Sequence, residues 1–197
     1  MCSYKANSTL QKSTPIILKR HEKLQEEYLS LANELVLNQI KKHTINAAAK
    51  KIGIYNKNFA IDSNFELLIL LDYIIFHHIG NGHKIIDRYI NNTKNNKPLD
   101  FDESNIIDLL INRSYGILKI IEVQSSGGIL IADVINKENF LLVDEVLSKS
   151  ALPNMFFATE YLHCGDFIMT TVAALPLTKG ISQISTLIRY SSELFEH

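Results

Sequence analysis

Three histidines and an aspartate lie close together in the middle of the chain and could hold a metal. His83 and Asp87 are four residues apart, so on one helix they share a face where an imidazole and a carboxylate can bind a divalent ion. His77 and His78 are adjacent and point about 100° apart on a helix, so they cannot both join that face. No Cys or Glu cluster completes the shell. We therefore expect surface histidines near a helix end, and no metal or other cofactor.

A cysteine beside a histidine, Cys164 after His163, raises the possibility of a thiol nucleophile. Such a pair needs the imidazole within hydrogen-bond reach of the sulfur and a third group that orients the ring. Neighbouring residues in a turn usually diverge, and the stretch HCGD is typical of a β-turn. The paired acids Asp102–Glu103 and Asp144–Glu145 are interpreted as charges at a helix start and a strand end. The motifs GxSxG, GxGxxG and GxxxxGK[ST] are absent.

A basic segment is the strongest indication of binding. The first sixty residues hold ten Lys or Arg and four Glu, a net charge of +6, whereas residues 61–197 have a net charge of −7. The stretch TINAAAKKIGIYNKN, with a helix, a Gly turn and a polar restart, resembles the beginning of a helix-turn-helix unit. The alternative is a small packing helix with a solvated basic face, because the sequence that follows is strongly apolar. The candidate binding residues in and around it are Lys41, Lys42, Lys50, Lys51 and Lys57.

Helices are expected to position these residues. Apolar spacing predicts a helix from Leu18 to His43, with Leu24, Tyr28, Leu31 and Leu35 on one face. Further helices are predicted over 45–52, 64–79, 83–91 and 100–113. The helix over 64–79 is apolar almost all round, so we expect it to be central.

After Tyr115 the apolar period changes to two, which indicates strands. We expect strands at 116–123, 129–135, 139–145, 155–162 and 166–173, paired sequentially, with a bulge near Glu122. Five short antiparallel strands tend to close into a small barrel, which removes exposed edges. A C-terminal amphipathic helix follows, with a stripe that docks within the chain or on a second copy, formed by Ile181, Ile184, Leu187, Ile188 and Leu194.

The predicted fold class is α+β, with an N-terminal helical part, a five-stranded small antiparallel β-barrel and a C-terminal helix. The expected boundaries are a flexible tail over 1–17, a helical domain over 18–113, the barrel over 114–176 and the helix over 177–197. The chain has 197 residues, 46% hydrophobic, with two cysteines and a net charge of −1. It shows no signal-peptide pattern and no apolar run long enough for membrane insertion, so we expect a cytoplasmic protein.

Several segments resemble a bacterial family of unassigned function that often carries a C-terminal SEC-C zinc motif. The resemblance covers about 65–173 and rests on Arg88–Tyr89, 113–115, 133–138 and 153–155. In that family the hairpin has Gly where this chain has Lys137, and the Pro turn continues with Gly and Asp. No Cys/His cluster follows the barrel here, so the resemblance implies the architecture and no reaction.

Three functions remain open. The first is a non-catalytic binding or adaptor protein that recognises a protein or nucleic-acid partner, as a monomer or homodimer. The second is an enzyme whose site assembles in three dimensions around His77 and His83 or around Cys164. The third is DNA binding through residues 44–64.

Overall fold

The computed structural model describes residues 10–54, 64–80, 82–96, 101–124, 128–171 and 173–177. These residues form two compact units. One unit contains the first helix up to Gln25 together with residues 113–170 and the chain from Pro176. The other contains residues 26–112 and the short segment 171–175. We refer to them as the barrel unit and the helical unit.

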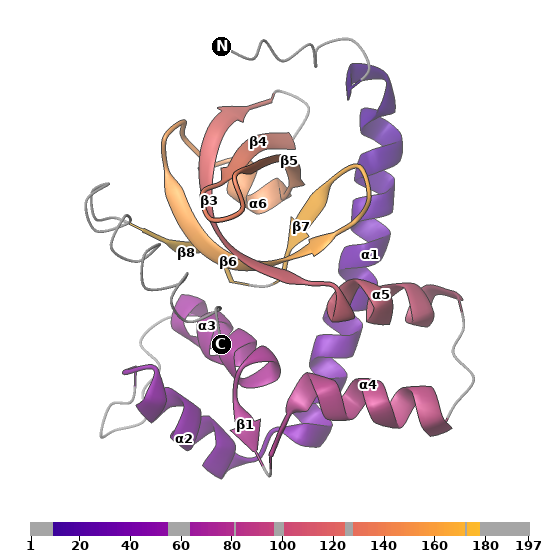
Figure 1. The fold of residues 1–197 in the computed structure, drawn as a ribbon, viewed down its shortest axis with the longest axis vertical. Coiled ribbons are helices and arrows are strands. Elements are labelled where there is room, and N and C mark those ends of the chain that lie inside the picture. Colours follow the sequence, from indigo (N-terminus) through magenta and orange to yellow (C-terminus); the bar gives the residue numbers. More distant parts are fainter. Residues whose placement is uncertain are drawn as a thin grey trace. The chain divides into compact units, whose positions relative to one another are not determined.

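Five helices precede the barrel (Figure 1). They are α1 (Leu10–Gln39), α2 (Lys42–Lys51), α3 (Asn64–Phe76), α4 (Ile85–Asn96) and α5 (Phe101–Ile111). The first begins earlier than the predicted Leu18 and ends before His43. Pro15 lies inside it and removes one backbone hydrogen bond. The helix nevertheless extends through Pro15, and just after it Ile17 and His21 are buried on the face that continues to Leu24.

The predicted apolar face of α1 is confirmed, because Leu24, Tyr28, Leu31 and Leu35 are all buried. The C-terminal half of α3 is buried: its side chains at Leu70, Ile74 and Phe76 have no exposed surface. Leu67, in the first half, is exposed, so α3 is not enclosed on every side as its apolar sequence predicted.

Asp72 is a buried carboxylate on α3, and it ties a distant part of the chain to the helical unit. Its Oδ2 accepts a hydrogen bond from the Thr171 hydroxyl at 2.6 Å and one from the Ala173 amide at 3.2 Å. Burial of a charge is tolerated where such donors surround it. The segment 171–175 is thereby held on α3.

A short hairpin replaces the end of one predicted helix and the start of the next. Strands β1 (Ile79–Gly80) and β2 (His83–Lys84) pair antiparallel. Gly82 has φ +82°, a left-handed conformation that glycine adopts without strain. The break between the predicted helices over 64–79 and 83–91 is confirmed, but the strands β1 and β2 were not predicted there.

The barrel unit is a closed five-stranded barrel, as expected. Its strands are β3 (Ser114–Val123), β4 (Gly128–Asp133), β5 (Glu138–Val143), β6 (Phe156–His163) and β7 (Ile168–Thr170). The long β3 pairs with β6 through its first half and with β4 through its second, which closes the ring (Figure 1). The two-residue strand β8 (Leu175–Pro176) lies beside β6.

Sequential pairing of all five strands was wrong, and the barrel is mixed rather than antiparallel. The order is β3-β4-β5-β7-β6, with β6 returning to β3 and β5 pairing with β7 in parallel through Leu142 and Ile168. The helix α6 (Glu145–Ser148) follows the third barrel strand and contacts β4. This order and this helix position are those of the OB fold, a five-stranded Greek-key barrel.

Aliphatic side chains fill the barrel, as the alternating pattern predicted. Leu118, Ile120, Ile131 and Leu142 have no exposed surface. The predicted bulge is confirmed, because the register between β3 and β4 shifts between Ile120 and Glu122. A bulge adds twist to the strand, which helps β3 pair with both β4 and β6.

The turn after β4 is organised by Asp133, whose side chain is 1% exposed. Its Oδ1 accepts from the amides of Ile135 and Asn136, and its Oδ2 accepts from the Tyr161 hydroxyl at 2.8 Å. A Cβ on Gly116 would lie 2.8 Å from this carboxylate, so the first barrel strand needs glycine there.

Two non-glycine residues have a left-handed backbone within the described ranges: Lys137, with φ 59°, and Asn154, with φ 69°. Both stand where the resembled family pattern has glycine. Glycine adopts this conformation without strain, and asparagine tolerates it better than lysine.

The predicted C-terminal helix and its apolar stripe lie outside the described residues. In the part of the chain that the structure covers, no helix is both long enough and apolar enough to cross a membrane.

Candidate anion-binding surface on the helical unit

Helix α2 has one buried face and one charged face. Ala48 and Ala49 are buried, and α2 packs on α3. On the opposite side His43 and Lys50 are exposed and Lys51 flanks them, because these positions lie away from the alanine pair in a helix of 3.6 residues per turn. The small alanines bring α2 close to α3, and the cations face outward.

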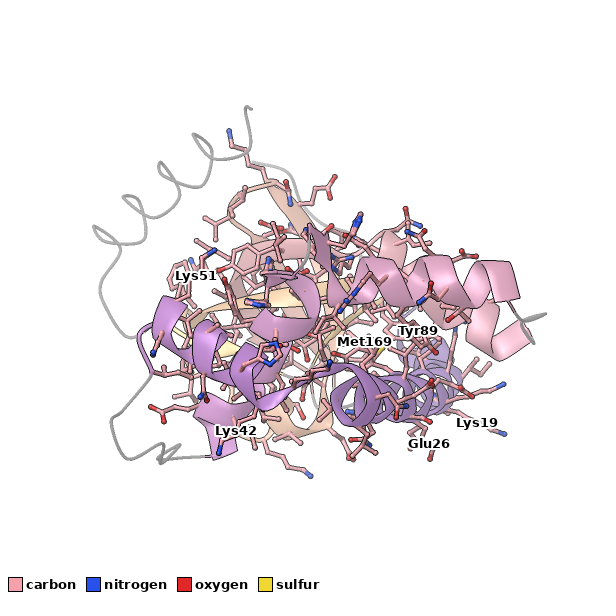
Figure 2. All side chains as sticks on the ribbon, turned by 90° about the horizontal axis from the view of Figure 1, so that it is seen from below. Lys19, Glu26, Lys42, Lys51, Tyr89 and Met169 are labelled. Carbon is pink, nitrogen blue, oxygen red and sulfur yellow. The ribbon has the colours of Figure 1, made fainter. Side chains whose placement is uncertain are left out.

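The two ends of α2 differ in their electrostatics. Lys50 and Lys51 occupy the last turn, where cations interact favourably with the helix dipole. Lys41 and Lys42 occupy the start, where cations are unfavourable. The N-cap Lys41 forms no side-chain cap, and the first turn has no acidic residue. The N-terminal cations thus lower the stability of α2. Figure 2 labels Lys42 and Lys51, the first and last residues of this helix.

The end of α3 carries a cluster of rings. The rings of Tyr73 and His77 are stacked, with centroids 6.0 Å apart and planes 24° apart. His78 meets the Tyr73 ring edge-on at 6.4 Å. The amides of both histidines donate to the Tyr73 carbonyl at 2.9 Å, which fixes the backbone where α3 ends. His77 is exposed, and Tyr73 lies on one side of its ring.

These two regions meet at His78. Burial lowers the pKa of His78, and the positive charges of Lys51 and His43 lower it further. Both α2 side chains therefore lie close enough to His78 to act on its charge. Residues 41–54 and 77–84 together contain five lysines and four histidines and no acidic residue. We call the side chains of Lys41–His43, Lys50–Lys51, His77–His78 and His83–Lys84 the basic surface.

Four of the five predicted binding lysines belong to this surface, and Lys57 lies outside the described residues. The histidines were not predicted to lie beside these lysines. The signal that could have linked them is the lack of Asp and Glu in both 41–54 and 77–84. The helix-turn-helix considered for residues 44–64 is described only as far as Ile54, and α3, which follows it, buries Leu70, Ile74 and Phe76. A recognition helix must present polar side chains to the groove.

The metal geometry considered for His83 and Asp87 does not occur. His83 lies on β2 and Asp87 on α4, so the two residues do not share one helical face. Among the residues that the structure describes, no group of three or more His, Cys, Asp or Glu side chains could hold a metal ion.

Cys164 lies in the barrel unit and is buried. Burial raises the pKa of its thiol to about 12, and the sulfur lies 3.7 Å from the Leu162 carbonyl. His163 does not pair with this sulfur. Its Nε2 lies 3.0 Å from the Ser114 hydroxyl, and its ring meets those of Phe140 and Tyr161 edge-on.

The Ser114–His163 pair was also missed, because its members are far apart in the sequence. A serine and an imidazole in contact resemble a nucleophile and its base. A catalytic triad also needs an acid that orients the histidine. Asp133 already accepts hydrogen bonds from two turn amides, the Asn136 side chain and the Tyr161 hydroxyl. The pair therefore joins the first residue of β3 to the last residue of β6.

The acidic pair at 144–145 has a structural role. Asp144 caps α6 by accepting from the Leu147 amide at 2.8 Å, and its second oxygen accepts from the Thr170 hydroxyl at 2.9 Å. The side chains of Asp102–Glu103 lie outside the described set. Across residues 113–177 the chain has four Lys or Arg and seven Asp or Glu, a net charge of −3. The barrel segment is thus acidic.

The comparisons with known proteins give a family but no activity. No curated protein and no solved structure matches the chain. A family model matches residues 17–191, which extends beyond the 65–173 of the resemblance noted above and spans both units. The chain belongs to this family, described as a family of unknown function (DUF7986).

Proposed function

We propose that this protein is a non-catalytic binding protein whose basic surface recognises an anionic macromolecule, with nucleic acid as the leading partner. The observation that carries the proposal is that α2 packs on α3, which places the acid-free segments 41–54 and 77–84 in one unit, where Lys51 and His43 both act on His78. Like charges brought together in a folded protein repel each other, and a polyanion relieves that repulsion.

The unfavourable charges at the start of α2 support the same conclusion. Lys41 and Lys42 oppose the helix dipole there. Residues that break a local stability rule without an evident compensating gain tend to mark functional sites.

The barrel supports a binding role through its topology alone. OB-fold barrels commonly bind oligonucleotides or oligosaccharides, but shared topology does not establish function. The net charge of −3 over residues 113–177 disfavours phosphate binding on the barrel strands. We therefore assign the anionic partner to the basic surface, and we infer a bacterial cytoplasm as the setting, on the family resemblance and the free thiol of Cys164.

The test is fluorescence anisotropy with labelled single-stranded and duplex oligonucleotides of about 12 nucleotides, at several salt concentrations. We expect affinity to fall as salt rises, because phosphate contacts release counterions. Lys42→Glu should weaken binding and reduce the slope of log affinity against log salt by about 1. Lys19→Glu, an exposed change of the same charge on α1, is the matched control. Salt-independent binding, or equal losses in both variants, would contradict the proposal.

An enzyme is the second candidate, and the 3.0 Å contact between Ser114 and His163 is what favours it. A fluorophosphonate probe reacts with an activated serine. We expect no labelling of Ser114, because the buried Asp133 is engaged with Tyr161 and the turn. Labelling that disappears in Ser114→Ala and in His163→Ala would establish a serine hydrolase instead.

A further inference from the structure

The exposed ring of His77 distinguishes the basic surface from a simple patch of lysines. Tyr73 lies four residues earlier on the same helical face, and its ring is half-buried and stacked with that of His77. The Tyr73 carbonyl accepts the His77 amide at 2.9 Å. The imidazole is therefore held by its backbone and by the tyrosine ring behind it.

An exposed ring backed by a second ring, on a surface that also carries lysines, suits an unpaired nucleobase. Proteins that bind single strands combine a positive surface for the backbone with aromatic or histidine rings on which bases stack. Bases of a duplex are already stacked on each other, so a duplex offers this surface mainly its phosphates. A ring at His77 adds binding energy only when the partner has an unstacked base.

We propose that the partner of the basic surface is a single-stranded nucleic acid, with one base stacked on the His77 ring and its phosphates beside Lys42 and Lys51. This inference rests on the proposed function and makes it more specific. The stack orients the base, and the α2 lysines bind the backbone without reading its sequence.

The experiment compares four labelled oligonucleotides of equal length: single-stranded RNA, single-stranded DNA, abasic single-stranded DNA and duplex DNA. Wild-type protein should bind the two natural single strands more tightly than the abasic strand, because only the former supply a base. His77→Ala should weaken binding to the natural strands by about 5- to 100-fold. The same variant should change the affinity for the abasic strand little.

Two further variants separate stacking from charge. His77→Phe keeps a flat ring without a titratable nitrogen, so it should retain the preference for natural strands. His83→Ala removes an exposed imidazole from β2, where no ring contact with Tyr73 is present. Because His83 belongs to the basic surface, this change should weaken binding to natural and abasic strands to the same extent and leave the ratio of the two affinities unchanged. Circular dichroism checks that each variant is folded.

The outcomes separate this inference from the proposed function. Salt-dependent binding with equal affinity for natural and abasic strands, unchanged by His77→Ala, would overturn the stacking inference and leave the anion-binding proposal standing. Binding of an acidic peptide but of no oligonucleotide would overturn the inference and identify a protein partner. Failure to bind any polyanion would overturn both.

Discussion

Reversing the charge at either end of α2 should change stability in opposite directions while weakening anion binding at both. Lys42 is the first residue of the helix and has no acidic neighbour in that turn. Lys42→Glu removes a cation from the positive end of the dipole and supplies an anion. Each change contributes about 0.3–1 kcal/mol, so the free energy of unfolding should rise by roughly 0.6–2 kcal/mol. At this chain length that corresponds to about 2–4 °C in Tm per kcal/mol.

Lys51→Glu is the mirror experiment, because Lys51 lies in the last turn, where a cation is favourable. It should lower the free energy of unfolding by a similar amount. Urea titration at low salt measures both shifts, and added salt should shrink them. Lys19→Glu on α1 should shift stability by less than about 0.5 kcal/mol. If Lys42→Glu and Lys51→Glu shift stability in the same direction, the dipole argument is refuted.

The remaining predictions concern the barrel unit. Tyr161→Phe removes a 2.8 Å donor to the buried Asp133 carboxylate, and it should cost about 1.5–3 kcal/mol in urea unfolding. A cost near zero would show that solvent replaces the hydroxyl. Lys137→Gly should raise the free energy of unfolding by roughly 0.5–1 kcal/mol, because φ is 59° there; a loss would mean that the lysine side chain contributes more than the strain costs. The Cys164 thiol, with its pKa raised to about 12 by burial, should resist iodoacetamide at pH 8 until urea unfolds the chain, and rapid native alkylation would contradict this. Burial lowers the pKa of His21 despite neighbouring carboxylates, so the unfolded chain takes up this proton at higher pH than the folded one. Stability should therefore fall as pH drops below about 6.5, by at most about 1.4 kcal/mol per pH unit for this group; a His21→Gln variant with the same pH dependence would refute its role.

The sequence allowed the fold class, the strands and the bulge to be predicted because those signals are local. Alternation over a few residues indicates a strand, and the conflict between Ile120 and Val123 on one face required the bulge near Glu122. Strand order, in contrast, depends on contacts between distant parts of the chain. The parallel pair of Leu142 and Ile168 depends on which edge remains open after the hairpin forms, and no pattern in either strand encodes it.

The candidate site was predictable in part for the same reason. The lysines of α2 stood out as a charge run in a short window. Their neighbours His77 and His78 lie between α3 and β1. The proximity of Lys51 to His78 depends on how α2 packs on α3, which no short window of sequence indicates. Ser114 and His163 are brought together by the β3–β6 register, in which Ser114 lies opposite Tyr161.

The hydrogen bond from Thr171 to Asp72 has a consequence for synthesis on the ribosome. Its partners are 99 residues apart. At about 5–20 residues per second, translation delivers the threonine roughly 5–20 s after the aspartate. Throughout that interval the Asp72 side chain lies on the apolar helix around Leu70 and Ile74, and the threonine that will donate to it has not yet been synthesised. The buried Asp72 carboxylate therefore gains the Thr171 and Ala173 donors only after all five barrel strands have been translated.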